Sequence, residues 1–174
     1  MAVSASRVGV RPLLRTDATA LIAAHRASVA LHRPWVSPCL DQAGFEAWFA
    51  RTLAEDYVSL IAHERDSGAV VGVFNASQIS RGNLLSAYLG YYACVPCAGR
   101  GLMREALPQV TAHLFGEVGL QHLEANIQPG NAASIALARG AGFRLEGFSP
   151  RYLRINGIWQ DHERWALLAD EAGF

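Results

Sequence analysis

The segment Ala87-Tyr-Leu-Gly-Tyr-Tyr92 is followed closely by Pro96-Cys-Ala-Gly-Arg-Gly-Leu-Met103. The first segment is rich in β-forming residues and predicts a strand, and the second predicts a glycine-rich loop that begins a helix. Gly99 and Gly101 let the backbone turn tightly, so that successive N–H groups at the start of the helix point toward one spot. With the positive end of the helix dipole, these amides indicate a site for phosphate or pyrophosphate, although an ordinary strand-to-helix turn has the same local pattern.

Outward from this segment, apolar periodicity predicts strands and helices along the whole chain. The expected strands cover residues 7–13, 57–63, 69–74, 87–92, 120–127, 143–155 and 159–168. The expected helices run from an N-cap at Thr16 to Pro34, from 41 to about 55, from the glycine loop to about 115 with a kink at Pro108, and from 131 to about 139. The last two strands meet at Asn156-Gly157, a strong hairpin signal. Without a repeat or a linker, this order predicts one domain over residues 1–174, of the mixed α/β or α+β class.

Composition narrows the classes of function. The chain has 174 residues, 51% hydrophobic and 17% charged, with a net charge of zero, which argues against a nucleic-acid partner or a polybasic membrane partner. It contains no lysine, which excludes every mechanism that needs a lysine of its own. The N-terminal stretch of residues 1–6 lacks the features of a signal peptide, so we expect a soluble, cytoplasmic protein.

Cysteine and histidine motifs offer weaker alternatives. Cys94-Val-Pro-Cys97 resembles the spacing of thiol-redox proteins, but the glycine turn separates it from the helix start that would lower a thiol pKa. Cys39 and the scattered histidines do not complete a zinc pattern, and no metal is expected. His25 falls on an apolar helical face and is expected to be a hydrogen-bonded core residue.

Several motifs in order resemble the GNAT superfamily of acyl-CoA-dependent N-acetyltransferases, and within it the RimJ/RimL type that acts on ribosomal proteins. The matching stretches span nearly the whole chain: Val10-Arg-Pro-Leu13, Arg33-Pro-Trp35, Tyr88-Leu-Gly-Tyr91, Gly99-Arg-Gly101, Asn131-Ala-Ala-Ser134, Gly142-Phe143, Glu146-Gly147 and Tyr152 to His162. The resemblance implies a mixed, mostly antiparallel central sheet of about seven strands, flanked by about four helices.

The resemblance also implies acetyl-CoA as cosubstrate and assigns residues to it. The loop amides would hold the pyrophosphate, at Ala98, Gly99, Arg100, Gly101, Leu102 and Met103. An N–H from Tyr91 or Tyr92 would polarise the thioester carbonyl. Asn131 would bind the pantetheine arm, and Ser134 would lie near the sulfur as a donor to the leaving thiolate.

The sequence departs from the family pattern at several of these positions. Ala98 and Met103 stand at the two ends of the glycine signature, the usual tyrosine acid falls at Ala138, and the glutamate base of one branch falls at Leu153. Glu124 is a candidate proton acceptor, with a structural ion pair to an arginine as the alternative. The acceptor groove is expected to use five residues that have core packing as their alternative: Trp35, Arg81, Tyr88, Tyr152 and Trp159.

The expected activity is direct transfer of an acetyl group to a primary amine in a ternary complex, by a monomer or a homodimer. An N-terminal α-amine, with a ribosomal protein as one candidate, needs the least help from a base, because deprotonating it at pH 7 costs about 1 kcal/mol against about 5 for a lysine. The alternatives are a small amine such as an antibiotic, polyamine or amino acid, a non-catalytic acyl-CoA-binding module, and a thiol-redox protein. A neutral aromatic groove would favour a peptide, and an acidic groove a polycation.

Overall fold

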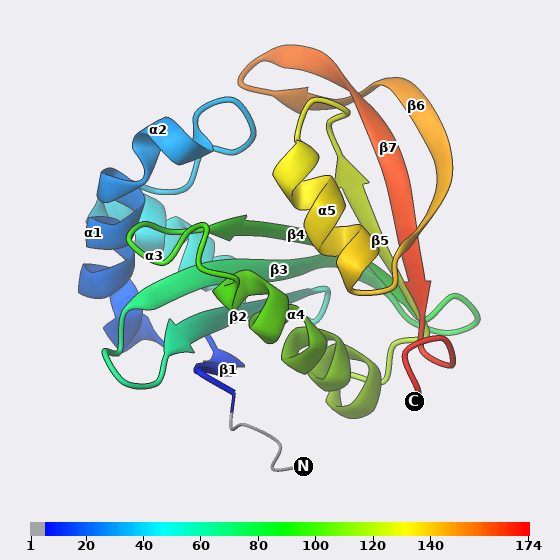
Figure 1. Cartoon of the computed structure of the whole chain (residues 1–174), viewed down its shortest axis with the longest axis horizontal. Helices are drawn as coiled ribbons and strands as arrows, with labels where there is room; N and C mark the ends of the chain where they lie inside the picture. Colours follow the sequence, from blue (N-terminus) through cyan, green and yellow to red (C-terminus); the bar gives the residue numbers. More distant parts are fainter. Residues whose placement is uncertain (1–5) are drawn as a thin grey trace.

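The computed structural model describes residues 6–174, so the expectation for residues 1–6 lies almost wholly outside the described part. A single seven-stranded sheet runs through the molecule in the order β1-β2-β3-β4-β5-β7-β6 (Figure 1). The strands are β1 (Val8–Pro12), β2 (Tyr57–Glu64), β3 (Val70–Ser80), β4 (Ser86–Ala93), β5 (His122–Ile127), β6 (Arg144–Ile155) and β7 (Ile158–Leu168). All neighbouring strands are antiparallel except β4 and β5, which confirms the predicted mixed, mostly antiparallel sheet.

Helices cover both faces of the sheet. They are α1 (Ala18–Ala27), α2 (Val29–His32), α3 (Gln42–Arg51), α4 (Leu102–Ala112) and α5 (Ala132–Gly140), with a short 3-10 turn before α1 and a π-helical turn after α4. Side chains of α1 and α3 pack on one face of β2 and β3, and side chains of α4 pack on the other. α5 lies beside α4 and contacts β5. None of the helices in residues 6–174 is both long and apolar enough to cross a membrane.

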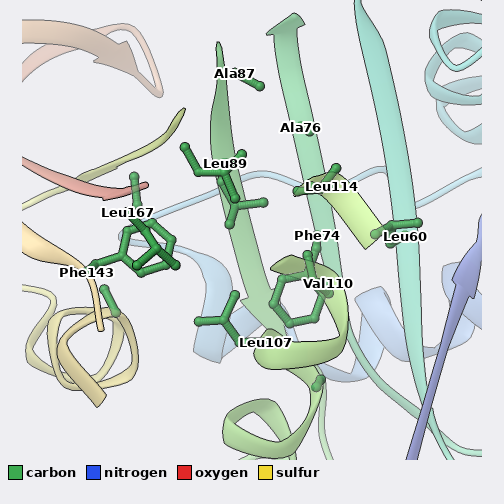
Figure 2. Close-up of a cluster of buried hydrophobic side chains, with 14 of the residues drawn as sticks. Leu60, Phe74, Ala76, Ala87, Leu89, Leu107, Val110, Leu114, Phe143 and Leu167 are labelled. Atoms are coloured by element: carbon green, nitrogen blue, oxygen red, sulfur yellow. The ribbon is translucent and has the colours of Figure 1, made fainter. Parts of the chain in front are cut away.

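The larger core lies between the sheet and α4. Leu60, Phe74 and Leu89 project from three adjacent strands toward Leu107 and Val110 of α4, as Figure 2 shows. Alternate residues of the same strands, such as Ile61 and Val73, pack against α1 and α3 in a second, smaller cluster. The central strands are therefore buried on both faces and give the site a rigid floor.

The structure corrects three details of the predicted elements. The first helix is broken at Ser28, and Thr16 is not its N-cap, because Asp17 forms the cap position and accepts the N–H of Leu14 at 2.8 Å. α4 runs through Pro108, as the sequence predicted. β3 extends beyond Phe74 to Ser80, because Asn75 and Ser77 pair with both neighbouring strands.

Candidate active site

The site lies where two central strands separate. β4 and β5 pair in parallel over only three residues, Ser86–Tyr88 with His122–Glu124, and then diverge (Figure 1). A cavity of about 300 Å³ opens between their free ends, lined by residues of β3, β4, β5, α2 and α5. The split leaves backbone groups of β4 available to a ligand that lies along the strand.

Strand register shows which amides face this opening. The N–H of Cys94 donates to the carbonyl of Val71 at 2.9 Å, so the alternation of an antiparallel ladder directs the amide of Tyr92 toward β3 as well. The amides of Tyr91 and Ala93 therefore face the opening. Of the two alternatives for polarising a carbonyl, the register favours Tyr91.

The glycine loop has the backbone geometry expected of an anion site. Gly99 and Gly101 adopt φ of 76° and 77°, a region that other residues rarely occupy. Within residues 6–174, no acceptor is found for the N–H groups of the five consecutive positions 99–103. The N–H of Ala98, by contrast, donates to the carbonyl of Cys94 at 3.0 Å. Five free donors at a helix start fit a pyrophosphate group, with Ala98 apart from them.

Charged side chains around the loop are arranged unevenly. The Arg100 guanidinium pairs with Glu64 at 2.5 Å, so that it holds the loop against β2. Arg104, which the motifs in the sequence did not indicate, lines a second cavity of about 230 Å³ next to the loop. It has no ion pair among the described residues. The position of Arg104 on the first turn of α4, directly after the glycines, is the feature of the sequence that could have indicated it as a residue of the anion site.

Ser134 lies where the two cavities meet, and Asn131 lines the first of them. The Asn131 side-chain oxygen accepts the Ser134 N–H at 3.2 Å and caps α5, which leaves the amide nitrogen of Asn131 to donate to a ligand. Tyr91 donates its hydroxyl to the Ser134 carbonyl at 2.9 Å, and burial raises the pKa of Tyr91. The Ser134 hydroxyl has no partner within residues 6–174 and belongs to the lining of both cavities.

The predicted acceptor residues separate into two groups: Trp35 and Trp159 line a cavity or a groove, whereas Tyr88, Tyr152 and Arg81 line none of the three. Trp35 lines the first cavity and, with Trp159, an adjoining open groove of about 430 Å³. The hydroxyls of Tyr88 and Tyr152 lie 3.5 Å apart, and this hydrogen bond, with burial, raises the pKa of Tyr152 to about 12. Arg81 is not among the residues that line these cavities, because its guanidinium donates to the Val118 carbonyl at 2.7 Å beyond the start of β4.

Glu124 belongs to a half-buried polar group on β5 and β7. Leu123 and Ala125 are part of the core, so Glu124 and Asn126 project from the opposite face of β5. One carboxylate oxygen of Glu124, Oδ1 of Asn126 and Nε of Arg164 are buried without a partner in residues 6–174. No ion pair between Glu124 and an arginine occurs there, so the structural alternative for this residue is not found.

The histidines and thiols take other roles. His25 is fully buried between the Cys39 carbonyl, at 2.8 Å, and the Tyr92 hydroxyl, at 3.2 Å, which confirms it as a hydrogen-bonded core residue. Burial raises the pKa of Cys94 to about 12 and also raises the pKa of Cys97. Redox catalysis requires a thiolate of low pKa, and both of these thiols have a raised pKa instead. No cluster of three or more metal-binding side chains occurs in residues 6–174.

The lining of the first cavity is aromatic, amide-rich and free of formal charge. It contains no Asp, Glu, Lys or Arg among the described residues. Asn75, Asn126 and His162 belong to it, although no motif in the sequence indicated them. For Asn75 the available signal was a polar residue directly after a strand of valines, at a position where the alternation expects burial.

Comparison with known proteins identifies the family. The family model described as an acetyltransferase (GNAT) domain matches residues 7–144, most of the chain. The chain belongs to the GNAT acetyltransferase family. This confirms the resemblance seen in the sequence, and the relatives of this GNAT chain are consistent with the RimJ type.

Three relatives illustrate the range. The [ribosomal protein uS5]-alanine N-acetyltransferase of Escherichia coli is 36% identical over 102 residues, which cover 59% of this GNAT chain and 53% of that protein. The structure of Mycobacterium smegmatis RimJ in complex with CoA-disulfide superposes with a TM-score of 0.84 at 28% identity, covering 96% of this chain and 84% of that one. Spermidine N-acetyltransferase from Vibrio cholerae, in complex with CoA and spermine, shares the fold with a TM-score of 0.81 at 17% identity over 96% and 98% of the two chains. The GNAT chain matches about half the length of its curated relatives.

Proposed function

We propose that this GNAT chain is an acetyl-CoA-dependent N-acetyltransferase whose acceptor is the N-terminal α-amine of a protein. The observation that carries the proposal is the split between β4 and β5. The free amides of the glycine loop lie at one end of this split, and the first, uncharged aromatic cavity lies at the other end. Ser134 lies where this cavity meets the second cavity beside the loop.

The part of the site that we assign to coenzyme A has hydrogen-bond donors and a positive charge without partners in residues 6–174. The five amides of residues 99–103 would hold the pyrophosphate, and the exposed Arg104 would add a positive charge beside it. The amide nitrogen of Asn131 and the free edge of β4 would bind the pantetheine arm. Met103 departs from the family signature, and its apolar side chain lines the second cavity beside the glycine loop.

The chemistry is aminolysis of a thioester. When bound, acetyl-CoA supplies an acyl carbon to which the amine nitrogen forms a bond as the carbon–sulfur bond breaks. The Tyr91 amide is the group that we assign to the developing negative charge on the carbonyl oxygen, a role worth about 10² to 10³ in rate for one donor. The Ser134 hydroxyl would relay a proton to the departing sulfur and recover, through water, the proton that the amine loses, because Ala138 lies in the core and offers no acid.

The amine proton needs an acceptor on the other side of the split. We assign this role to Glu124, through water, because its carboxylate has an unpartnered oxygen beside Asn126, which lines the cavity. An α-amine lowers the demand on this base, since its pKa of about 8 leaves a useful neutral fraction at pH 7. Leu153, at the position of the alternative base, is partly exposed on β6 and cannot take a proton.

The charge of the acceptor cavity favours a peptide over a polyamine. A polycation binds well only where carboxylates compensate its charges, and none lines the first cavity among the described residues. Trp35 and Trp159, which line the adjoining groove, offer apolar surfaces for the residues that follow a terminal amine. The names of the E. coli relative and of RimJ support the same class, and a ribosomal acceptor would place the reaction in the cytoplasm.

The test is thiol release from acetyl-CoA with mass spectrometry of the acceptors. The panel contains peptides that begin with Ala, Ser or Met, the same peptides with blocked N-termini, and spermidine. Acetylation of the free peptides alone is the expected result. Transfer to spermidine alone would overturn the acceptor class, and coenzyme A binding without any transfer would overturn the enzymatic function in favour of a binding module.

A further inference from the structure

Asn75 lies on the floor of the acceptor cavity. It occupies the middle of β3, where it pairs with Ser59 of β2 on one side and Gly90 of β4 on the other. Its strand neighbours on the same face, such as Val73, pack under α1 and α3, whereas Asn75 reaches the cavity lining. It is thus a polar side chain that the fold delivers to a defined point of the cavity.

A chain of hydrogen bonds fixes the orientation of its carboxamide. The indole Nε1 of Trp48 donates to the Ser59 hydroxyl at 3.1 Å, and that hydroxyl donates to Oδ1 of Asn75. An indole N–H can only donate, so Ser59 accepts from it and gives its own proton onward. A buried hydroxyl proton needs an acceptor, and only the carboxamide oxygen can serve. Trp48 therefore determines, through Ser59, that Asn75 turns its oxygen away from the cavity.

The amide nitrogen of Asn75 remains available to a ligand. No hydrogen bond from Nδ2 is found within residues 6–174, and Nδ2 is not among the buried atoms that lack a partner. Gly90, its neighbour across the ladder, also lines the cavity, and a Cβ there would meet no atom within 4 Å. The space beside Asn75 is therefore open to an acceptor molecule.

Resting on the proposed function, we propose that Asn75 determines acceptor specificity by donating a hydrogen bond to an uncharged oxygen next to the reacting amine. A peptide N-terminus carries such an oxygen in its first carbonyl, or in the hydroxyl of an initial Ser. A polyamine carries ammonium and methylene groups only, and an ammonium N–H meets the Nδ2 donor as one donor facing another. The oriented carboxamide thus selects a peptidyl acceptor and disfavours a polyamine.

The test compares variants of the full chain on four acceptors: peptides that begin with Ala or Ser, an Ala-initiated peptide with its first carbonyl reduced to a methylene, and spermidine. Asn75→Leu should lower kcat/KM for both normal peptides roughly tenfold, through KM, because the hydrogen bond forms in the ground state as well. If the carbonyl is the partner, the reduced peptide should lose at least as much kcat/KM in the unmodified chain as the Ala-initiated peptide loses in the Leu variant. Reduction removes the acceptor oxygen and leaves a protonated amine beside Nδ2. A loss confined to the Ser-initiated peptide would assign the hydroxyl instead.

Asn75→Asp replaces the hydrogen-bond donor Nδ2 by a negatively charged carboxylate oxygen, so it should lower kcat/KM for the peptides and raise kcat/KM for spermidine. Ser59→Ala should shift the preference in the same direction by less, since it frees the carboxamide to rotate. Asn83→Asp, which adds the same charge in the exposed β3–β4 turn, is the matched control. Coenzyme A affinity and the melting temperature serve to exclude a folding defect. Equal changes on all acceptors would overturn this inference alone, whereas an unmodified chain that acetylates none of them overturns the proposed function and this inference with it.

Discussion

The Ser134 hydroxyl provides a sharp test at the scale of single residues. Ser134→Ala leaves the helix cap intact, because the cap uses the backbone N–H of Ser134 and the side chain of Asn131. We expect kcat to fall by about 10², the lower end for a positioned proton donor, with KM for acetyl-CoA nearly unchanged. Ser67→Ala in the exposed β2–β3 turn is the control in steady-state assays. Equal kcat values for the two variants would contradict the role of Ser134.

At this scale the sequence predicted best the conformations of single residues. Gly99 and Gly101 form the predicted tight turn and Asn131 caps α5, and such local conformation is encoded by neighbours in sequence. Asn75 and Arg81 depend on which strands pair and how the turns fold back. Their positions follow from tertiary structure, which residue spacing alone does not contain.

At the scale of elements, substitutions in the glycine loop can separate a loss of coenzyme A binding from the backbone strain that any residue other than glycine causes there. Gly99 and Gly119 have nearly equal φ, 76° and 78°, and neither has an atom within 4 Å of a built Cβ. Alanine at either position should therefore cost a similar free energy of unfolding, about 1–2 kcal/mol. Only Gly99→Ala should also weaken coenzyme A binding, measured by calorimetry. Similar affinities in the two variants would argue against the loop as the pyrophosphate site.

The α1–α2 region predicts a pH dependence of stability. His25 and His32 are 0% and 3% exposed, and burial lowers the pKa of each below its ordinary value of 6.5. Folding thus favours the neutral rings, so their contribution is complete above pH 6.5 and is lost as the pH falls toward the folded pKa. We expect the unfolding free energy to decrease below pH 6.5 with a slope approaching about 1.4 kcal/mol per pH unit for each histidine.

Chemical denaturation at a series of pH values measures this slope, and NMR titration of the two rings in the native chain measures the pKa directly. Ring titrations at or above pH 6.5 would contradict the assignment. The slope should be shallower in His32→Gln, whose amide can still donate to the Ala93 carbonyl that His32 contacts at 2.7 Å.

Element types were predictable, and element ends less so. Periodicity and turn chemistry predicted every strand of the sheet, including the hairpin at Asn156-Gly157, because these signals are local. The break at Ser28 was not predicted, since its hydroxyl bonds to the Ala24 carbonyl and accepts the Val95 N–H from a distant loop. The C-terminal half of β3 was not predicted either, because its polar residues gain their strand partners only in the folded sheet.

At the scale of the whole molecule, charge predicts different salt responses for the two substrates. The chain has zero net charge and no formally charged residue on the lining of the acceptor cavity among the described residues. The KM for a neutral-side-chain peptide should therefore change by less than about twofold between low and moderate salt. Coenzyme A carries phosphates and should bind more weakly as salt rises. Steady-state kinetics at several ionic strengths would show this contrast, and a steep salt dependence for the peptide would contradict it.

The order of the strands was beyond the reach of the sequence without the family resemblance. Nothing in local patterning places β5 between β4 and β7, or limits its parallel pairing to three residues. Both depend on how the helices pack on each side, which involves residues far apart in the chain. The resemblance supplied the general architecture, and the structure supplied the depth and lining of the split.

The short contact between β4 and β5 divides the sheet into two blocks joined by a narrow seam. The block of β1–β4 leads into the glycine loop that we assign to the common donor, and the block of β5–β7–β6 supplies much of the wall facing the variable acceptor. Substitutions on β6 and β7 that line this wall can therefore accumulate with little disturbance of the glycine loop. A seam of this kind makes the architecture modular, and an inherited donor site can be combined with new acceptors as a lineage diversifies.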